Sequence, residues 1–221
     1  MFSSLKDLEL QHLQQKLYLS PYKTLFWAQQ HMLILSDLHL GKAAHFRKHG
    51  MAIPNSVHLP DFNRLELAID QYNPKQVMIL GDLFHSRHNK DWERWINWMG
   101  VVKNKVENFV LVKGNHDILE DNLYATFDLV VDTFTKPPYI FTHEETKHKS
   151  LYNLYGHIHP GISIKGKGRQ SIKLPCFYFG KRHGILPAFG NFTGIYQISY
   201  KFDDQIFAIT DNSVVKLRLN N

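Results

Sequence analysis

In the first half of the chain, short apolar runs alternate with longer segments whose apolar residues recur every three or four positions. The short runs predict buried strands at about residues 17–19, 24–27, 32–35, 77–80 and 109–112. The longer segments predict helices at about residues 4–15, 61–72 and 89–106. Regular alternation of strands with helices indicates an α/β protein.

The helix predicted at 89–106 has a strongly apolar inner face. This face comprises Trp92, Trp95, Ile96, Met99 and Val106. Because Trp92 and Trp95 are spaced as core residues, we expect them to pack against the sheet rather than to stack on a cofactor.

From about Leu129 the chain changes to short alternating strands broken by Gly and Pro. A β-rich second half after an α/β first half argues against a simple doubly wound sheet and favours two packed mixed sheets flanked by helices. The length of 221 residues suits one domain, which we expect to span residues 1–221.

Composition limits the class of protein and the cellular compartment that we expect. Hydrophobic residues make up 43% of the chain and charged residues 21%, which is ordinary for a globular protein. There is no run of about 18 apolar residues, so we expect no membrane span, and the N-terminus does not resemble a secretory signal. The single cysteine, Cys176, excludes an intramolecular disulfide and favours the reducing cytoplasm.

The charge and the histidine content raise the possibility of metal and phosphate chemistry. The formal net charge of +6 favours polyanionic partners, although many mildly basic proteins bind no nucleic acid. The chain has 14 histidines, and histidine is the commonest metal ligand in proteins.

Several predicted strands run directly into polar residues. Asp37 and His39 follow the run Leu33–Leu35, and residues two apart on an extended chain point the same way, so both can bind one ion. Gly81-Asp82 follows the strand at 77–80, and Gly114-Asn115-His116-Asp117 follows the strand at 109–112. Strand ends form a rigid platform on which ligands from several strands can converge.

Further candidates occur later in the chain. His143 follows the apolar run Tyr139–Phe141, and His157 and His159 follow Gly156. Oxygen and imidazole donors without thiolate suit Mn, Fe or Zn. The candidate ligands are Asp37, His39, Asp82, Asn115, His143, His157 and His159. With one carboxylate bridging, these residues are enough for two ions about 4 Å apart, the spacing that supports displacement at phosphorus.

Each element alone has a plainer interpretation as a turn or a surface pair. The ordered set resembles the calcineurin-like metallophosphoesterase superfamily. Four longer strings are similar to the ligase-associated DNA-damage-response endonuclease family (PdeM): SDLHLGKAAHFRKHG, LGDLFHS, GHIHPG and LPAFGNFTG. The resemblance implies a four-layer α/β/β/α sandwich with a two-metal site at the strand ends. We expect this site to hold two Mn ions, with Fe or Zn as alternatives.

The resemblance also implies roles for the residues. One metal is expected at Asp37, His39 and His159, and the other at Asn115, His143 and His157, with Asp82 bridging them. His148 competes with His143, because the sequence around His143 is a looser match. His116 resembles the catalytic histidine that stabilises or protonates the departing oxygen.

Two residues near these motifs have roles suggested by their chemistry. Asp117 is expected to orient the His116 imidazole, with capping of a following helix as the alternative. Arg47 is the expected substrate-phosphate contact, because it follows the first motif and its guanidinium suits phosphate. Other basic residues, including Lys173 and Lys181, are further candidates for contact with a phosphate chain. Their alternative role is to protect sheet edges from aggregation.

The leading functional prediction is a metal-dependent phosphodiesterase or DNA endonuclease, in which the metals make hydroxide available to attack phosphorus. Its substrate is expected to be single-stranded or flexible DNA, in DNA repair, with a functional link to a helicase and a DNA ligase implied by the resemblance alone. One alternative is an enzyme for nucleotides or other small phosphoesters on the same two-metal site. Another is a non-catalytic scaffold, which the full set of motifs disfavours.

Overall fold

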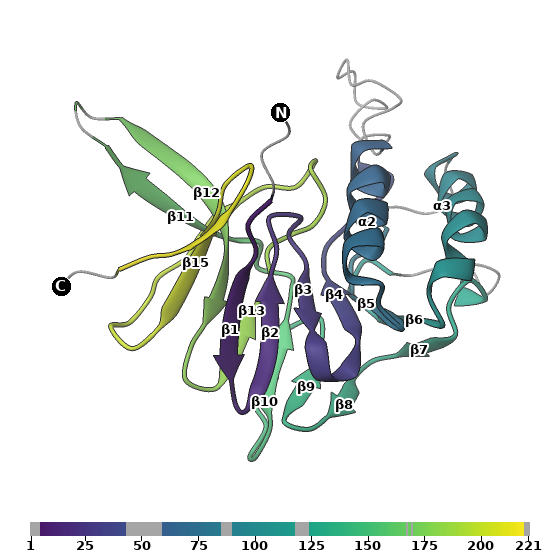
Figure 1. The fold of residues 1–221 in the computed structure, drawn as a ribbon, viewed down its shortest axis with the longest axis horizontal. Helices are drawn as coiled ribbons and strands as arrows, with labels where there is room; N and C mark the ends of the chain where they lie inside the picture. The colour runs from purple at the N-terminus through teal and green to yellow at the C-terminus, as the bar shows by residue number, and fades with distance from the viewer. Residues whose placement is uncertain are drawn as a thin grey trace.

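A computed structural model gives the fold of residues 5–42, 59–84, 90–117, 124–166, 168 and 170–218 (Figure 1). The first half of the chain forms a seven-stranded sheet in the order β1 to β7. Its strands are β1 (Leu8–His12), β2 (Gln15–Leu19), β3 (Leu25–Trp27), β4 (Met32–Leu35), β5 (Gln76–Leu80), β6 (Asn108–Val112) and β7 (Leu129–Val131). Strands β1 to β4 pair antiparallel, whereas β4 to β7 pair parallel.

The second half forms a nine-stranded mixed sheet in the order β14-β11-β12-β13-β10-β9-β8, with β15 pairing β12 and β16. The strands from β8 to β12 are β8 (Phe134–Lys136), β9 (Tyr139–Phe141), β10 (Tyr152–Tyr155), β11 (Pro160–Lys165) and β12 (Ser171–Phe179). The remaining strands are β13 (His183–Ile185), β14 (Tyr196–Gln197), β15 (Gln205–Ile209) and β16 (Val214–Lys216). Strand β10 lies between β9 and β13 and is parallel to both.

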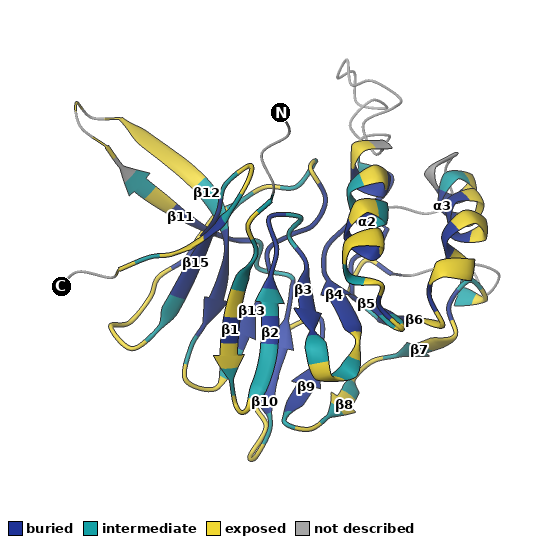
Figure 2. Cartoon of the chain, in the orientation of Figure 1, coloured by how far each residue is buried: buried dark blue, intermediate teal, exposed yellow. Residues whose placement is uncertain are grey.

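Two helices cover the outer face of the first sheet, α2 (Leu59–Tyr72) and α3 (Lys90–Val102) (Figure 1). Their inner faces are buried and their outer faces are exposed (Figure 2). One apolar core joins these helices to the first sheet, and a second joins the two sheets. The expected pair of mixed sheets with helices is therefore present, but the described residues place no α-helix on the outer face of the second sheet.

The N-terminal segment corrects the prediction of a helix at residues 4–15. Residues 8–19 form the β1–β2 hairpin instead, and its two-residue turn places Leu13 and Gln14 at φ values of 50° and 60°. Such a turn matches the twist of the paired strands. Leu10 is buried against the sheet core, whereas Leu13 is 49% exposed, so the helical spacing of the leucines was misleading.

The third predicted helix is shorter than expected. Helix α3 ends at Val102, and residues Lys103–Lys105 form a single 3₁₀ turn. Trp92 and Trp95 are buried in the core as predicted, whereas Ile96 is 44% exposed, contrary to the prediction. No helix in the described part of the chain is long and apolar enough to cross a membrane.

The two sheets are joined at one edge by backbone contacts. Ser36, which follows β4, pairs with Ala188, which follows β13. The backbone N–H of Phe189 donates to the Ser36 carbonyl at 2.8 Å, and that of Leu186 donates to the Tyr155 carbonyl at 2.8 Å. These contacts bring the carboxyl ends of β4 and β10 to the same place.

Candidate metal centre

Five strand ends supply the candidate site. Strands β4, β5 and β6 are parallel neighbours, so their carboxyl ends share one edge of the first sheet. Strands β9 and β10 are parallel neighbours in the second sheet, and their ends meet the same region. The side chains that follow these five strands are Asp37 and His39, Asp82, Asn115 to Asp117, His143, and His157 and His159.

The first cluster consists of Asp37, His39 and His159, whose ligand atoms lie within 4.8 Å of one another. The two imidazole Nε2 atoms are 3.1 Å apart, and the Nε2 of His159 is 3.4 Å from the Asp37 carboxylate. Asp37 is fully buried, and both of its carboxylate oxygens accept from the His157 backbone N–H, at 2.9 and 3.2 Å. The ligand atoms of these three residues therefore lie close enough together to bind a single ion.

The second cluster consists of Asp82, His143 and His157, again within 4.8 Å of one another. The Nε2 of His143 lies 3.0 Å from the Nδ1 of His157 and 3.1 Å from the Oδ1 of Asn115. The other ring nitrogen of His143 contacts the Leu80 carbonyl at 3.0 Å, which fixes the ring orientation. Asn115 thus lies beside this cluster, as the sequence predicted.

Asp82 lies between the two clusters. Its Oδ1 is 3.3 Å from the His143 Nε2, and its Oδ2 is 3.8 Å from the His39 Nε2. One carboxylate therefore offers an oxygen to each side, which is the arrangement of a bridging ligand. The whole set predicted from the sequence is brought together by the fold.

Five of these seven donors have a left-handed backbone. The φ values are 55° for Asp37, 51° for His39, 50° for Asp82, 63° for His157 and 53° for His159. Non-glycine residues rarely adopt this conformation, and each instance costs about 1–3 kcal/mol unless its surroundings hold it in place. Cross-strand hydrogen bonds provide that support, because the N–H groups of Asp37 and His39 donate to the carbonyls of Gly81 and Asp82 at 3.1 and 2.9 Å.

Two glycines make the close approach possible. A Cβ on Gly81, whose φ is 72°, would collide with the His143 ring and with the backbone of Gly114. A Cβ on Gly156 would lie 2.5 Å from the Asp37 carboxylate. Each glycine therefore leaves the space in which one candidate ligand sits.

The two clusters differ in electrostatics. Burial lowers the pKa of His39 to about 3, although Asp37 and Asp82 oppose this shift. Burial also acts to lower the pKa of His143, but its hydrogen bond to Asp82 and the charge of that residue raise it to about 9. For Asp82, burial acts to raise the pKa, and the His143 contact outweighs burial and lowers it to about 2. His39 is thus a neutral imidazole with a lone pair for a cation, whereas His143 and Asp82 form an ion pair.

The Asp117 carboxylate joins two loops. It accepts from the backbone N–H groups of Gly114 at 2.9 Å and Phe84 at 3.2 Å, and its expected role in orienting the His116 ring stays a prediction. Burial raises the pKa of Asp117 to about 6. The residues that a helix cap would involve lie outside the described part of the chain.

His116 lies at the open side of the site. Its side chain is 43% exposed, and its Nε2 is 4.0 Å from the Asp82 carboxylate. The His116 backbone N–H donates to the Asp82 Oδ1 at 3.1 Å. The imidazole therefore lies next to both clusters and remains accessible from solvent.

His143 and His148, the two candidate ligands for the second cluster, differ in position and burial. His143 is buried in the second cluster, whereas His148 is exposed and its Nδ1 accepts from the Leu151 backbone N–H at 3.0 Å. Arg47, the expected phosphate contact, lies outside the described residues.

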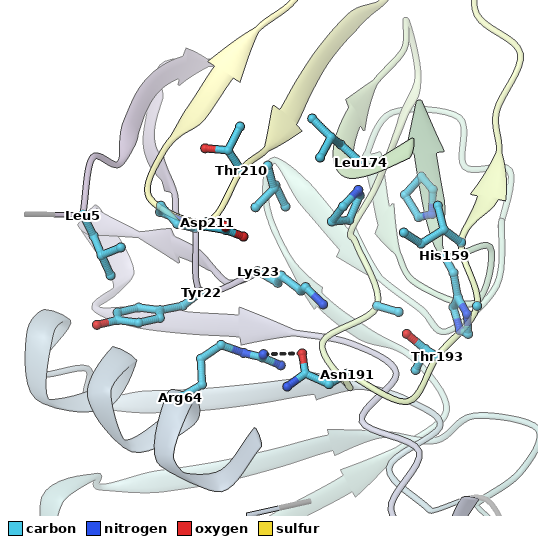
Figure 3. A pocket seen from close by; sticks show the side chains of 17 residues that line it. Leu5, Tyr22, Lys23, Arg64, His159, Leu174, Asn191, Thr193, Thr210 and Asp211 are labelled. Carbon is cyan, nitrogen blue, oxygen red and sulfur yellow. Dashed lines mark hydrogen bonds between the residues drawn. The ribbon is translucent and has the colours of Figure 1, made fainter. Parts of the chain in front are cut away.

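A cavity extends from each cluster. One, of about 460 Å³, has His159 in its wall, and the other, of about 230 Å³, has Asn115 and His143 in its wall (Figure 3 shows the larger). Among the residues that line the larger cavity, the sequence predicted only His159 as a site residue. Lys23 and Arg64 come from segments outside the strings that resemble the endonuclease family, whereas Asn191 and Thr193 lie in one of them, LPAFGNFTG.

Two packed mixed sheets, with oxygen and imidazole donors collected at their shared edge, form the architecture of a metallophosphoesterase sandwich. The chain belongs to the calcineurin-like phosphoesterase family, whose sequence model matches residues 31–210. This family uses a pair of divalent metal ions, and the two clusters supply suitable donors for them. No curated protein sequence matches the chain significantly.

Among solved structures, the chain is similar to that of Pseudomonas putida nuclease MPE, with a TM-score of 0.80 and 28% sequence identity over 96% of this chain and 100% of that one. A weaker match is YfcE, a phosphoesterase from E. coli, with a TM-score of 0.45 and 14% identity over 86% of this chain and 99% of that one. The family model and the similarity to the nuclease structure confirm the superfamily prediction.

Proposed function

We propose that this protein is a metal-dependent phosphodiesterase that cuts single-stranded or flexible DNA as an endonuclease in DNA repair. The main support is the position of Asp82, which presents one oxygen toward His39 and the other toward His143. Membership of a phosphoesterase family and similarity to a bacterial nuclease support the reaction and the substrate class.

The residues have distinct proposed roles. Asp37, His39 and His159 would hold one divalent ion, Asn115, His143 and His157 would hold the other, and Asp82 would bridge the two ions. When bound, such ions polarise a phosphodiester and make a nearby water more acidic. We propose manganese as the metal, because mixed carboxylate, amide and imidazole donors suit it, with iron or zinc as alternatives.

His116 is proposed to stabilise or protonate the departing oxygen. The ring is exposed on the substrate side and lies 4.0 Å from Asp82, so a phosphodiester at the metal centre would lie within its reach. Asp117 would act indirectly, because it holds the loop that begins at Gly114 against the backbone of Phe84. Arg47 remains a proposed phosphate contact on the basis of sequence alone.

Three features support a polymer substrate. Cavities lead away from both clusters, which suits a chain that continues on both sides of the cut bond. The formal net charge is +6, which favours a polyanion. Tyr196 is 65% exposed and its backbone N–H donates to the His159 carbonyl at 2.9 Å, so we propose that its ring is available for stacking by an unpaired base.

The test is cleavage of circular single-stranded DNA, linear duplex DNA and a chromogenic phosphodiester, each with Mn, Mg or Zn. We expect nicking of the single-stranded circle by the wild-type protein and its loss in Asp82→Asn. The control Asp70→Asn removes an equal charge from a surface residue that pairs with Lys105, and it should leave nicking intact. Cleavage of the small ester without any DNA cleavage would favour the alternative, a small-molecule phosphoesterase.

The proposed link to a helicase and a DNA ligase rests only on the resemblance of the longer sequence strings. Co-purification of the tagged chain from its own cells, with and without DNA digestion, tests it. Recovery of neither enzyme would remove this part of the proposal and leave the chemistry unaffected.

A further inference from the structure

The larger cavity borders the first metal cluster at His159 and extends away from it (Figure 3). It lies among the β2–β3 turn, helix α2 and the segments around residues 174 and 191, with His159 at one end. Its volume of about 460 Å³ is in the range of pockets that hold small ligands. The walls combine apolar residues, such as Pro21, Leu174 and Ile195, with a few polar side chains.

Lys23 is held in this cavity by a strained turn. Its φ is 63°, a left-handed conformation that lysine rarely adopts. The turn is closed by bonds from the Lys23 N–H to the Ser20 carbonyl and from the Ser20 N–H to the Thr24 carbonyl, both 2.9 Å. Figure 3 shows the Lys23 side chain extending into the cavity toward Asn191 and Thr193. The turn therefore fixes the backbone of Lys23 at the cavity wall.

The Lys23 ammonium has no hydrogen-bond or ion-pair partner among the described residues. Burial and the neighbouring Arg64 lower its pKa to about 8, although Asp61 opposes the shift. In contrast, the exposed Lys105 ammonium lies 3.0 Å from Glu66 and 2.8 Å from Asp70. A partly buried cation without an acceptor is unfavourable, and a bound anion would relieve that cost.

Arg64 adds positive charge but is already fixed in place. Its guanidinium donates to the Asp61 carboxylate at 2.8 Å and to the Asn191 side-chain oxygen at 2.6 Å, and it lies 4.3 Å from the centre of the Phe189 ring. Asp211 is the one acidic side chain among the described residues that line the cavity. Lys23 is therefore the cation available to a ligand.

The cavity wall is attached to the first cluster. Next to Phe189, the backbone N–H of Gly190 donates to the Asp37 carbonyl at 3.1 Å, and the Thr193 hydroxyl donates to the Gly190 carbonyl at 2.8 Å. His159 belongs both to the cluster and to the cavity lining. A group bound beside Lys23 thus lies along the surface that continues from the metal centre.

We propose that this cavity binds a nucleotide unit of the substrate next to the bond that is cut, with Lys23 as the counter-charge to its phosphate. The apolar walls around Leu174 and Ile195 would contact the sugar and base. The assignment rests on the proposed function, because it takes the metal centre as the site of cleavage.

The first test compares substrates with and without neighbouring nucleotides in the manganese-loaded protein. In Lys23→Gln we expect the KM for a short single-stranded oligonucleotide to rise about tenfold, as for the loss of a hydrogen bond to a charged group. The salt dependence of oligonucleotide binding should fall by about 0.7 in log–log slope, the value for one phosphate contact. Hydrolysis of a chromogenic phosphodiester, which has no neighbouring nucleotide, should be unchanged.

Two matched variants control this test. Lys75→Gln removes the same charge from an exposed residue that pairs with Glu107 and should leave both substrates unaffected. Lys23→Arg should restore most oligonucleotide binding. Unchanged oligonucleotide kinetics in Lys23→Gln would overturn the assignment, and so would an equal loss on both substrates, because Lys23 would then support the fold or the metal centre.

A second measurement separates this assignment from the proposed function. Thymidine 5′-monophosphate is titrated calorimetrically into the full chain with EDTA, so that metals cannot hold the phosphate. Weaker binding by Lys23→Gln than by the wild type supports the nucleotide subsite. If the wild type cuts no DNA, that second result overturns only the proposed function. Equal binding by wild type and variant would overturn the subsite even if DNA is cut.

Discussion

The two metal clusters contain similar donors but differ in their protonation. In the first, burial holds His39 neutral, with a pKa of about 3. In the second, Asp82 stabilises a proton on His143 and raises its pKa to about 9. The comparison shows that the same residue types at the ends of neighbouring strands can form one site that accepts a cation directly and another that must first release a proton.

Removal of one ligand from each cluster should have the largest effect. His39→Ala and His143→Ala should each reduce phosphodiester cleavage by roughly 10³-fold, because charge neutralisation at phosphorus is the main contribution expected from the metals. Each variant should also lose one of two bound ions, measured by elemental analysis. His148→Ala, at the exposed competing histidine, should change neither quantity, and a loss of activity there would contradict the assignment of His143.

The pH dependence of metal binding should distinguish the clusters. Below about pH 9 a cation at the second cluster must displace the proton of His143. Protonation of this residue alone should therefore lower the affinity of the second cluster for the cation about tenfold for each unit by which the pH falls. His39 is already neutral above about pH 3 and adds no such dependence to the first cluster. Equilibrium dialysis from about pH 9 to about pH 6 should show one ion lost before the other. Parallel loss of both ions would refute the contrast.

The two glycines next to the ligands test the packing of each cluster separately. Gly81→Ala introduces both a collision with the His143 ring and an unfavourable φ, and should cost about 2–3 kcal/mol. Gly156→Ala has only the contact with Asp37 and Ser36 and should cost less. Thermal unfolding measures both. Gly100→Ala in helix α3, where a Cβ meets nothing within 4 Å, should be neutral or stabilising, and destabilisation there would undermine the comparison.

A half-buried histidine far from the clusters in sequence, His12, gives the smallest effect. Burial among Tyr139, Tyr152 and Phe179 lowers the pKa of His12 from 6.5 to about 4. In that range the unfolded chain binds a proton that the folded chain does not, so the free energy of unfolding should fall as the pH falls from about 6.5 to about 4. Thermal melts should show a weaker dependence in His12→Gln. An equal dependence would show that burial alone does not keep this imidazole neutral.

Local sequence was informative for buried strands and for the residues at their ends. The apolar runs at β4, β5 and β6 specify buried parallel strands, and the donors directly after them need no long-range information to be placed at the sheet edge. Local patterning failed at the N-terminus, because the β1–β2 turn uses Leu13 and Gln14 instead of the usual glycine or asparagine.

The sequence by itself therefore determined the type of fold and the chemical identity of the candidate ligands. Only the tertiary structure gave the distances that place His143 rather than His148 in the second cluster and Asp82 between the clusters, and only it showed that Lys23 faces a cavity near His159. The physical reason is that strand formation depends on neighbouring residues, whereas these distances depend on packing between segments up to 136 residues apart in the chain, such as Lys23 and His159.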